Sequence, residues 1–180
     1  MFRSAISGRC IPARPPVNRQ REEDPIATAS DVGDYAERHD LTVAVAESLT
    51  GGNLATALAA APDSAEWFHG GVVAYSVSVK QSVLGVPDVP VVSETAALAM
   101  AEGVRALTDA DVAAATTGVG GPGTEEGQPV GSVWCAVATR DTSWAVHRQF
   151  DGEPGEILDQ SVQCALDLLH DGARRIVESA

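Results

Sequence analysis

The chain has 180 residues, 44% of them hydrophobic, and a formal net charge of −13 at pH 7. This length supplies one hydrophobic core, so we expect a single main domain, and no apolar run reaches the roughly 20 residues that cross a bilayer. Because phosphate backbones bind basic surfaces, the negative charge argues against nucleic acid as a partner.

Positive charge is concentrated at the amino-terminal end, where five arginines and three prolines precede the first acidic residue, Glu22. We expect residues 1–24 to be a disordered basic tail or to reflect a misassigned start codon, with residues 25–180 forming the domain. A nucleic-acid or lipid role for the tail is a less favoured alternative.

The three cysteines, Cys10, Cys135 and Cys164, are odd in number and form no Cys-x-x-Cys pair. Cys135 and Cys164 lie within apolar patterns and are interpreted as small core residues. A reducing cytoplasm is the predicted location, since nothing in this usage favours disulfides.

In the first half of the chain, a helix is expected from about residue 24 or 25 to residue 39, with Ile26, Val32 and Tyr35 facing inward. The β-branched run at 42–46 predicts a buried strand. Apolar residues from Leu54 onward follow helical spacing, and a second strand is expected at 70–76.

Helices are then expected at 78–84 and 94–107, the latter capped by Ser93. A strand at 111–116, a hairpin of 131–139 with 142–150, and a last helix with Pro154 in its first turn complete the chain. This alternation predicts an α/β fold, a single three-layer α/β/α domain with a mixed β-sheet.

Polar residues follow the first strand abruptly, in the sequence Glu47-Ser-Leu-Thr-Gly-Gly52. A strand, a glycine turn and a helix in succession would place the Ser48 hydroxyl at a strand end facing a helix N-terminus, which suits an anion. The alternative is that Thr50 caps the helix and the glycines only form the turn. The nucleophile-elbow motif Gly-x-Ser-x-Gly is absent, so the pattern does not indicate an α/β-hydrolase.

A second glycine-rich stretch, Gly118-Val-Gly-Gly-Pro-Gly123, matches the dinucleotide-binding pattern Gly-x-Gly-x-x-Gly. That pattern must open a helix, whereas here Pro122 removes a backbone N–H and another strand is expected to follow. We therefore disfavour dinucleotide binding. The stretch either borders a small-molecule pocket or is a connector.

Lys80 is the only lysine in the chain, beside 11 arginines. A buried lysine can lose its proton near neutral pH, which arginine cannot, so Lys80 is a candidate general base. It lies five residues after Tyr75, and the two side chains are expected to share one pocket. The alternative to a role as base is that one lysine remains in the sequence by chance.

Six short motifs occur in an unbroken order: Ala46-Glu-Ser-Leu-Thr-Gly-Gly52, Tyr75-Ser-x-x-x-Lys80, Leu84-Gly-Val86, Val92-Ser-x-x-x-Ala97, Met100-Ala-x-Gly103 and Gln128-Pro-Val-Gly131. Together they resemble the C-terminal domain of the CinA family, the nicotinamide mononucleotide deamidases. The resemblance covers nearly all of the chain from Ala27 onward.

This resemblance implies hydrolysis of the nicotinamide carboxamide to nicotinate plus ammonia, in pyridine nucleotide recycling. Ser48 is then the expected nucleophile, Lys80 its base and Tyr75 a proton donor or relay. Backbone amides from Thr50 to Gly52 would receive the oxyanion. The expected substrate-binding residues are Glu47, Thr50, Gly51, Gly52, Thr117 and Gly118.

The expected partner is a small nucleotide substrate, with no nucleic acid, no membrane, no cofactor and no metal, and a homo-oligomer is predicted. The four histidines show no ligand spacing.

The chain departs from the family pattern at several positions. Leu49 stands where the family has cysteine, Gln128 replaces a lysine, the glycine loop differs, and Pro154 and Leu158 occupy the places of two arginines. The missing arginines leave two hypotheses open: an active serine amidohydrolase, or a nucleotide-binding regulatory homologue without turnover.

Overall fold

The computed structural model describes residues 26–180, so the expectation of a basic tail at residues 1–24 lies outside the described part. Six helices and five strands make up this part. In chain order they are α1 (Ala29–Arg38), β1 (Val43–Glu47), α2 (Asn53–Ala59), α3 (Ser64–Trp67), β2 (Phe68–Val73), α4 (Val77–Leu84), α5 (Glu94–Thr108), β3 (Val112–Gly118), β4 (Ser132–Ala138), β5 (Ser143–Gln149) and α6 (Pro154–Glu178). None of these helices is both long and apolar enough to cross a membrane.

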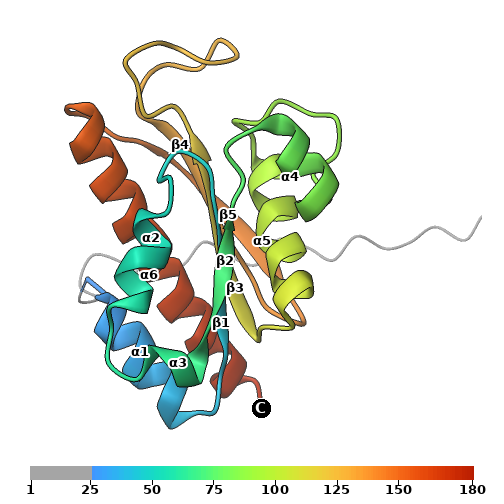
Figure 1. The fold of residues 1–180 in the computed structure, drawn as a ribbon, viewed down its shortest axis with the longest axis vertical. Coiled ribbons are helices and arrows are strands. Elements are labelled where there is room, and N and C mark those ends of the chain that lie inside the picture. Colours follow the sequence, from blue (N-terminus) through green and yellow to red (C-terminus); the bar gives the residue numbers. More distant parts are fainter. Residues whose placement is uncertain (1–25) are drawn as a thin grey trace, which may run out of the picture.

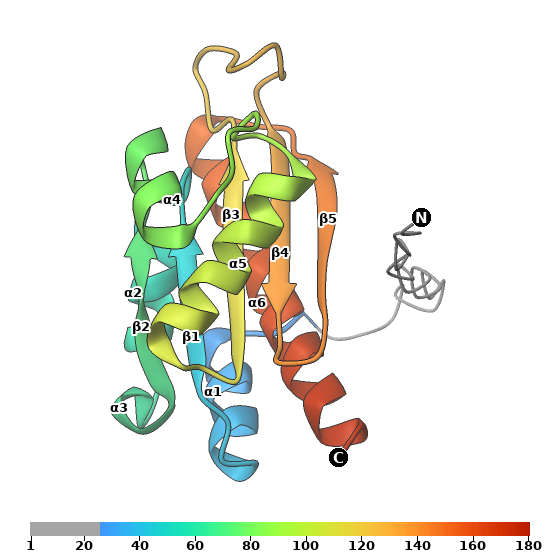
Figure 2. The same cartoon turned by 90° about the vertical axis from the view of Figure 1, so that its right-hand side faces the viewer.

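The five strands form one sheet in the order β2-β1-β3-β4-β5. β1 pairs in parallel with β2 and β3, while β3–β4 and β4–β5 are antiparallel, which confirms the predicted mixed sheet and hairpin. The carboxyl ends of β1, β2 and β3 therefore meet at one edge. The loop of residues 119–131 rises above that edge (Figure 2).

Successive side chains of each strand point to opposite faces of the sheet, so the hydrophobic core has one part on each face. In β1, Val43 and Val45 pack with α1, α2 and α6, whereas Ala44 and Ala46 pack with α4 and α5. Figure 1 shows these two helical layers on opposite sides of the sheet. The predicted three-layer α/β/α architecture is thus confirmed.

Small residues allow α5 to lie close to its neighbours. A Cβ atom added at Gly103 of α5 would lie 2.2 Å from the Leu84 carbonyl oxygen at the end of α4. Only glycine fits this contact, which holds α4 against α5. The position of α4 matters because this helix carries Lys80.

The prediction for the second strand, residues 70–76, was wrong by two residues at its start and three at its end. β2 spans Phe68–Val73, and after it the Ala74 amide donates to the Glu47 carbonyl (2.7 Å). The Ser76 hydroxyl then accepts from the Val79 amide and caps α4, so Tyr75 lies beyond the sheet. The sequence did not indicate the end of β2 because the apolar run continues beyond it.

The first helix also begins later than predicted. Thr28 and Asp31 form a capping box that starts α1 at Ala29. Val32 is buried and Tyr35 packs against the same core, but Ile26 precedes the helix and is 70% exposed, so its inward placement was wrong. The short helix α3, with Trp67 buried, was not predicted.

Candidate active site

Ser48 is the first residue beyond the carboxyl end of β1. Its amide donates to the Thr116 carbonyl of β3 (3.0 Å), which continues the parallel pairing by one residue. Its side chain has no hydrogen-bond partner among residues 26–180 and borders a cavity of about 380 Å³. The hydroxyl is thus available to a molecule in that cavity.

Glu47 is fully buried, and its carboxylate is bound by the first turn of α2. Oε2 accepts from the amides of Gly52 (3.0 Å) and Leu54 (3.1 Å), and Oε1 accepts from Ala55 (2.8 Å). These amides would otherwise have no partner at a helix N-terminus. Glu47 therefore fixes the turn after β1 and does not line the cavity, and its substrate-binding role stays a prediction.

Thr50, Gly51 and Gly52 are also turn residues and do not line the cavity. The Thr50 hydroxyl lies 2.8 Å from that of Thr116, while Gly51 and Gly52 have φ values of 60° and 107°. The Gly51 amide donates to the Ser48 carbonyl (3.1 Å), and the Gly52 amide to Glu47. Both glycine amides have hydrogen-bond partners in this structure, and their role at an oxyanion stays a prediction.

Lys80 lies on α4 with only 2% of its surface exposed. Nζ donates to the carbonyl oxygens of Ala74 (2.8 Å) and Tyr75 (3.3 Å), and the side chain lines the cavity. Burial lowers the pKa of Lys80, opposed by the negative charges of Glu125 and Glu126. A neutral amine has two N–H groups and one lone pair, so both donors are used and the lone pair remains.

The cavity opens at the joint carboxyl edge of the parallel strands, the usual place for ligands in α/β sheets. Thr117 and Gly118, from the end of β3, border it as predicted. The Thr117 hydroxyl donates to the Val91 carbonyl (2.7 Å), which ties the segment before α5 to β3. A Cβ atom at Gly118 would lie 2.6 Å from the Ser132 carbonyl oxygen, so the strand needs glycine there.

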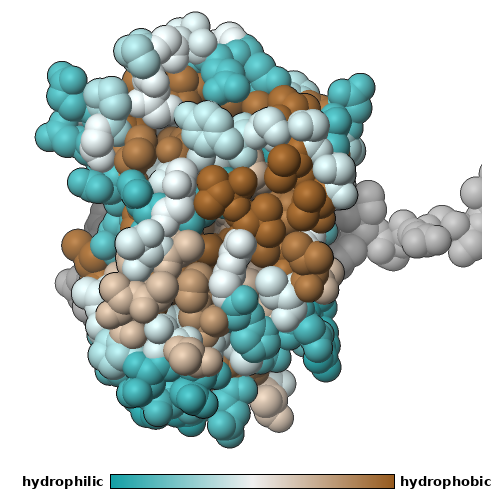
Figure 3. All heavy atoms as spheres, in the orientation of Figure 1, coloured by the Kyte–Doolittle hydropathy of each residue, from teal (hydrophilic) through white to brown (hydrophobic). Residues whose placement is uncertain are grey.

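Tyr75 lines the same cavity but is 75% exposed, so it lies at the rim. The predicted convergence of Tyr75 and Lys80 on one pocket is therefore correct. Val73 and Val77, on either side of Tyr75 in the chain, and Val83 are also exposed. Figure 3 shows hydrophobic surface gathered over the end of β2 and α4. One side of the cavity mouth is thus apolar.

Pro154 and Leu158, at the start of α6, line the cavity at its far side. The two positions that lack the family's arginines therefore face the candidate site. Leu49, which replaces a cysteine, lines it too and packs against the core.

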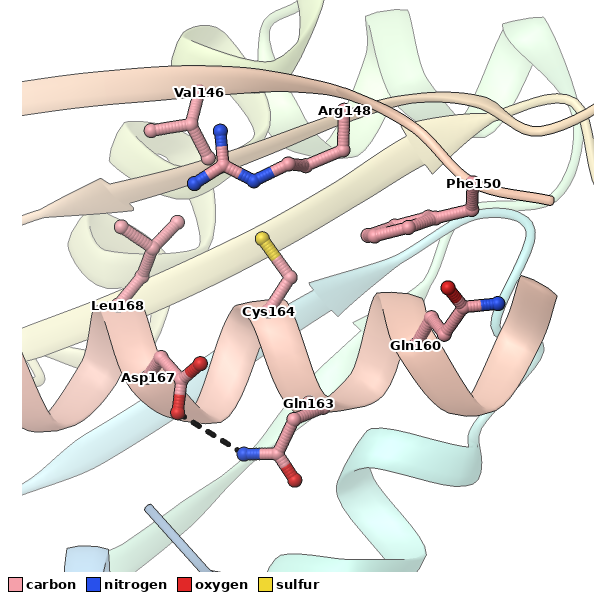
Figure 4. Close-up of a pocket in the computed structure, with 8 residues that line it drawn as sticks. All are labelled: Val146, Arg148, Phe150, Gln160, Gln163, Cys164, Asp167 and Leu168. Atoms are coloured by element: carbon pink, nitrogen blue, oxygen red, sulfur yellow. Dashed lines mark hydrogen bonds between the residues drawn. The ribbon is translucent and has the colours of Figure 1, made fainter. Parts of the chain in front are cut away.

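Arg148 does not supply the missing charge. It lines a different cavity of about 240 Å³ between β5 and α6, where it extends over Cys164 (Figure 4). Asp167 and Gln163 border this second cavity and are hydrogen-bonded to each other (3.0 Å). Cys164 is partly exposed there, whereas Cys135 is fully buried, as expected of a core cysteine.

Sequence reasoning missed Glu125, which lines the cavity from the loop above the sheet. Glu125 and Glu126 follow the glycine stretch, but nothing in their spacing indicates that they approach Lys80. Across residues 26–180, no cluster of three His, Cys, Asp or Glu side chains is arranged to hold a metal.

A mixed β-sheet between two helical layers, with a cavity at the carboxyl edge of its parallel strands, places this protein in the α/β class. Residues 26–172 match the model of the CinA C-terminal domain, and the chain belongs to that family. It is 40% identical over 151 residues to a Pseudomonas putida protein named nicotinamide-nucleotide amidohydrolase PncC, covering 80% of this chain and 94% of that one.

Other relatives are longer. A CinA-like protein of Gloeobacter violaceus is 44% identical over 156 residues, which are 82% of this chain but 36% of that protein. Among solved structures, a CinA superfamily protein of Klebsiella pneumoniae superposes with a TM-score of 0.78 at 33% identity, covering 82% of this chain and 96% of the other. One from Escherichia coli gives 0.77 at 32% identity, covering 86% and 98%.

Proposed function

We propose that this chain is an amidohydrolase that converts the carboxamide of an N-ribosylated nicotinamide to the carboxylate and ammonia. The observation that carries the proposal is the meeting of Ser48, Tyr75 and a buried Lys80 around one cavity. The 40% identity to the Pseudomonas putida amidohydrolase supports the same chemistry.

In the first half of the reaction, Ser48 Oγ bonds to the carboxamide carbon and its proton passes to the lone pair of Lys80. The Leu49 amide has no partner among residues 26–180, and Leu49 lines the cavity. We assign the oxyanion to this amide, since the residue after a serine nucleophile is a common donor.

In the second half, the carbon–nitrogen bond breaks and ammonia leaves with the proton held by Lys80, passed on directly or through Tyr75 at the rim, so that Lys80 is neutral again. The product is an ester of Ser48. Water then attacks that ester while Lys80 accepts a proton from it, and Lys80 returns this proton to Ser48 Oγ as the carbon–oxygen bond breaks and the carboxylate leaves.

The absence of arginine at positions 154 and 158 supports a second candidate, a nucleotide-binding homologue without turnover. Ammonia release by purified protein from nicotinamide, nicotinamide riboside and nicotinamide mononucleotide separates the two. Stoichiometric release over many turnovers is expected for the amidohydrolase. Binding of these compounds without ammonia would favour the regulatory homologue.

A further inference from the structure

The candidate cavity contains two charged side chains among the described residues that line it, Lys80 and Glu125. When Lys80 is neutral, as a general base must be, Glu125 leaves the cavity with one net negative charge. The cavity is therefore suited to a cationic ligand, in a protein whose overall charge of −13 acts in the same direction.

Glu125 is held at the cavity by the loop that carries it. Its amide donates to the Gln128 carbonyl (3.3 Å), and the Gln128 amide donates to the Glu125 carbonyl (2.8 Å). Next to it, the Glu126 carboxylate accepts from the Val92 amide (3.2 Å), and Val92 itself lines the cavity. The loop is thereby fixed to the segment before α5.

The Glu125 carboxylate differs from that of Glu126 because it accepts no hydrogen bond among residues 26–180. It has no role in holding the loop, since its backbone groups make those contacts. Its exposed position at the cavity leaves it free to interact with a bound molecule.

We propose that Glu125 selects the positively charged pyridinium ring of the substrate, an inference that rests on the proposed function. N-Ribosylated nicotinamide carries a quaternary ring nitrogen, whereas nicotinamide and the 1,4-dihydropyridine riboside are neutral. With the carboxamide at Ser48, the ring lies within the cavity that Glu125 borders. Glu125 then raises affinity for the cationic form alone.

The test uses the Ser48→Ala chain, in which binding is measured without turnover. Titration calorimetry at low salt gives the dissociation constants of nicotinamide riboside and of its 1,4-dihydro form. Adding Glu125→Gln should weaken riboside binding by about fivefold, as for a partly exposed ion pair, and leave dihydro-riboside binding within about twofold. Glu37→Gln makes an equal charge change at an exposed position of α1 and should alter neither dissociation constant.

An equal change for both ligands, or no change for either, would overturn the selection of charge by Glu125. Suppose that the unaltered protein releases ammonia, but Glu125→Gln leaves the ratio of the two dissociation constants unchanged. The proposed function would then stand and this inference alone would fail. If neither riboside bound and no ammonia appeared, both would fail.

Discussion

At Lys80, burial favours the loss of one proton from the ammonium group. The ammonium form has no lone pair, so only the neutral form accepts the proton of Ser48. Because burial lowers the Lys80 pKa from 10.5, kcat/KM should rise with pH and level off below that value. Removing the nearby negative charge in Glu125→Gln should move the inflection to lower pH.

The measurement is kcat/KM for ammonia release across about pH 6 to 10, the range in which lowered lysine pKa values fall. Lys80→Arg keeps the charge but cannot act as a base, so it should lose at least about a hundredfold in rate and also the rise with pH. A profile that stays flat in the unaltered protein would remove Lys80 as the base.

Some of these residue-level features were predictable from sequence. The spacing of Tyr75 and Lys80, with the absence of any other lysine, was enough to predict that they share a pocket. Glu47 was not predictable, because a glutamate in a polar turn looks the same whether it faces a ligand or three backbone amides. Glu125 was missed because its approach to Lys80 depends on how the loop folds back over the sheet.

At the scale of elements, the link between β1 and α2 depends on the buried Glu47 carboxylate. Glu47→Gln replaces an oxygen that accepts hydrogen bonds with an NH₂ group that cannot, so at least one helix amide loses its partner. The free energy of unfolding should fall by about 1.5–3 kcal/mol. Urea denaturation measures this change.

Glu66→Gln, at an exposed position on α3, is the matched control and should change stability by less than about 0.5 kcal/mol. If Glu47→Gln were as stable as this control, the carboxylate would not be holding α2, and a direct role at the substrate would be favoured again.

The contact between α4 and α5 predicts a second effect on stability. Gly103→Ala would force a Cβ atom against the Leu84 carbonyl, so α4 must shift and stability should fall by about 1–3 kcal/mol. Because α4 carries Lys80, ammonia release should fall as well.

Gly155→Ala provides the comparison, since a Cβ atom at this position on α6 meets nothing within 4 Å. It should leave the thermal midpoint unchanged or slightly raised. Unchanged stability and activity in Gly103→Ala would show that the two helices are not tightly coupled.

Element identities were more predictable than their ends. α5 begins where Ser93 and Glu94 predicted it, because the Ser93 hydroxyl accepts from the Ala96 amide. The end of β2 was misplaced because Ala74 and Tyr75 continue an apolar pattern after the strand has ended. The glycine stretch after β3 opens no helix, and β4 follows it, as the Pro122 argument predicted.

At the scale of the whole molecule, charge should decide which nicotinamide compound is used. A phosphate monoester carries close to two negative charges, which the net charge of −13 repels, and none of the residues from 26 to 180 that line the cavity is an arginine. We expect little preference for the mononucleotide over the riboside. Pro154→Arg with Leu158→Arg should raise the mononucleotide's relative kcat/KM by about tenfold or more, since charge-assisted bonds contribute roughly 1.5–3 kcal/mol each.

Ala65→Arg with Leu107→Arg adds the same two charges at exposed sites outside the cavity and should not change this ratio. A preference of about a hundredfold for the mononucleotide in the unaltered protein, equal to about 2.7 kcal/mol, would mean that its phosphate binds elsewhere. Homo-oligomer formation stays a prediction, as do the small-molecule partner and the cytoplasmic location.

Whether Ser48 is the nucleophile is tested by ammonia release from nicotinamide riboside and mononucleotide in Ser48→Ala. Loss of a serine nucleophile should reduce turnover by about four to six orders of magnitude, with the unfolding midpoint unchanged. Ser82→Ala, an exposed serine of α4 outside the cavity, should keep full activity. Ammonia release by Ser48→Ala at the rate of the unaltered protein would exclude Ser48 as the nucleophile.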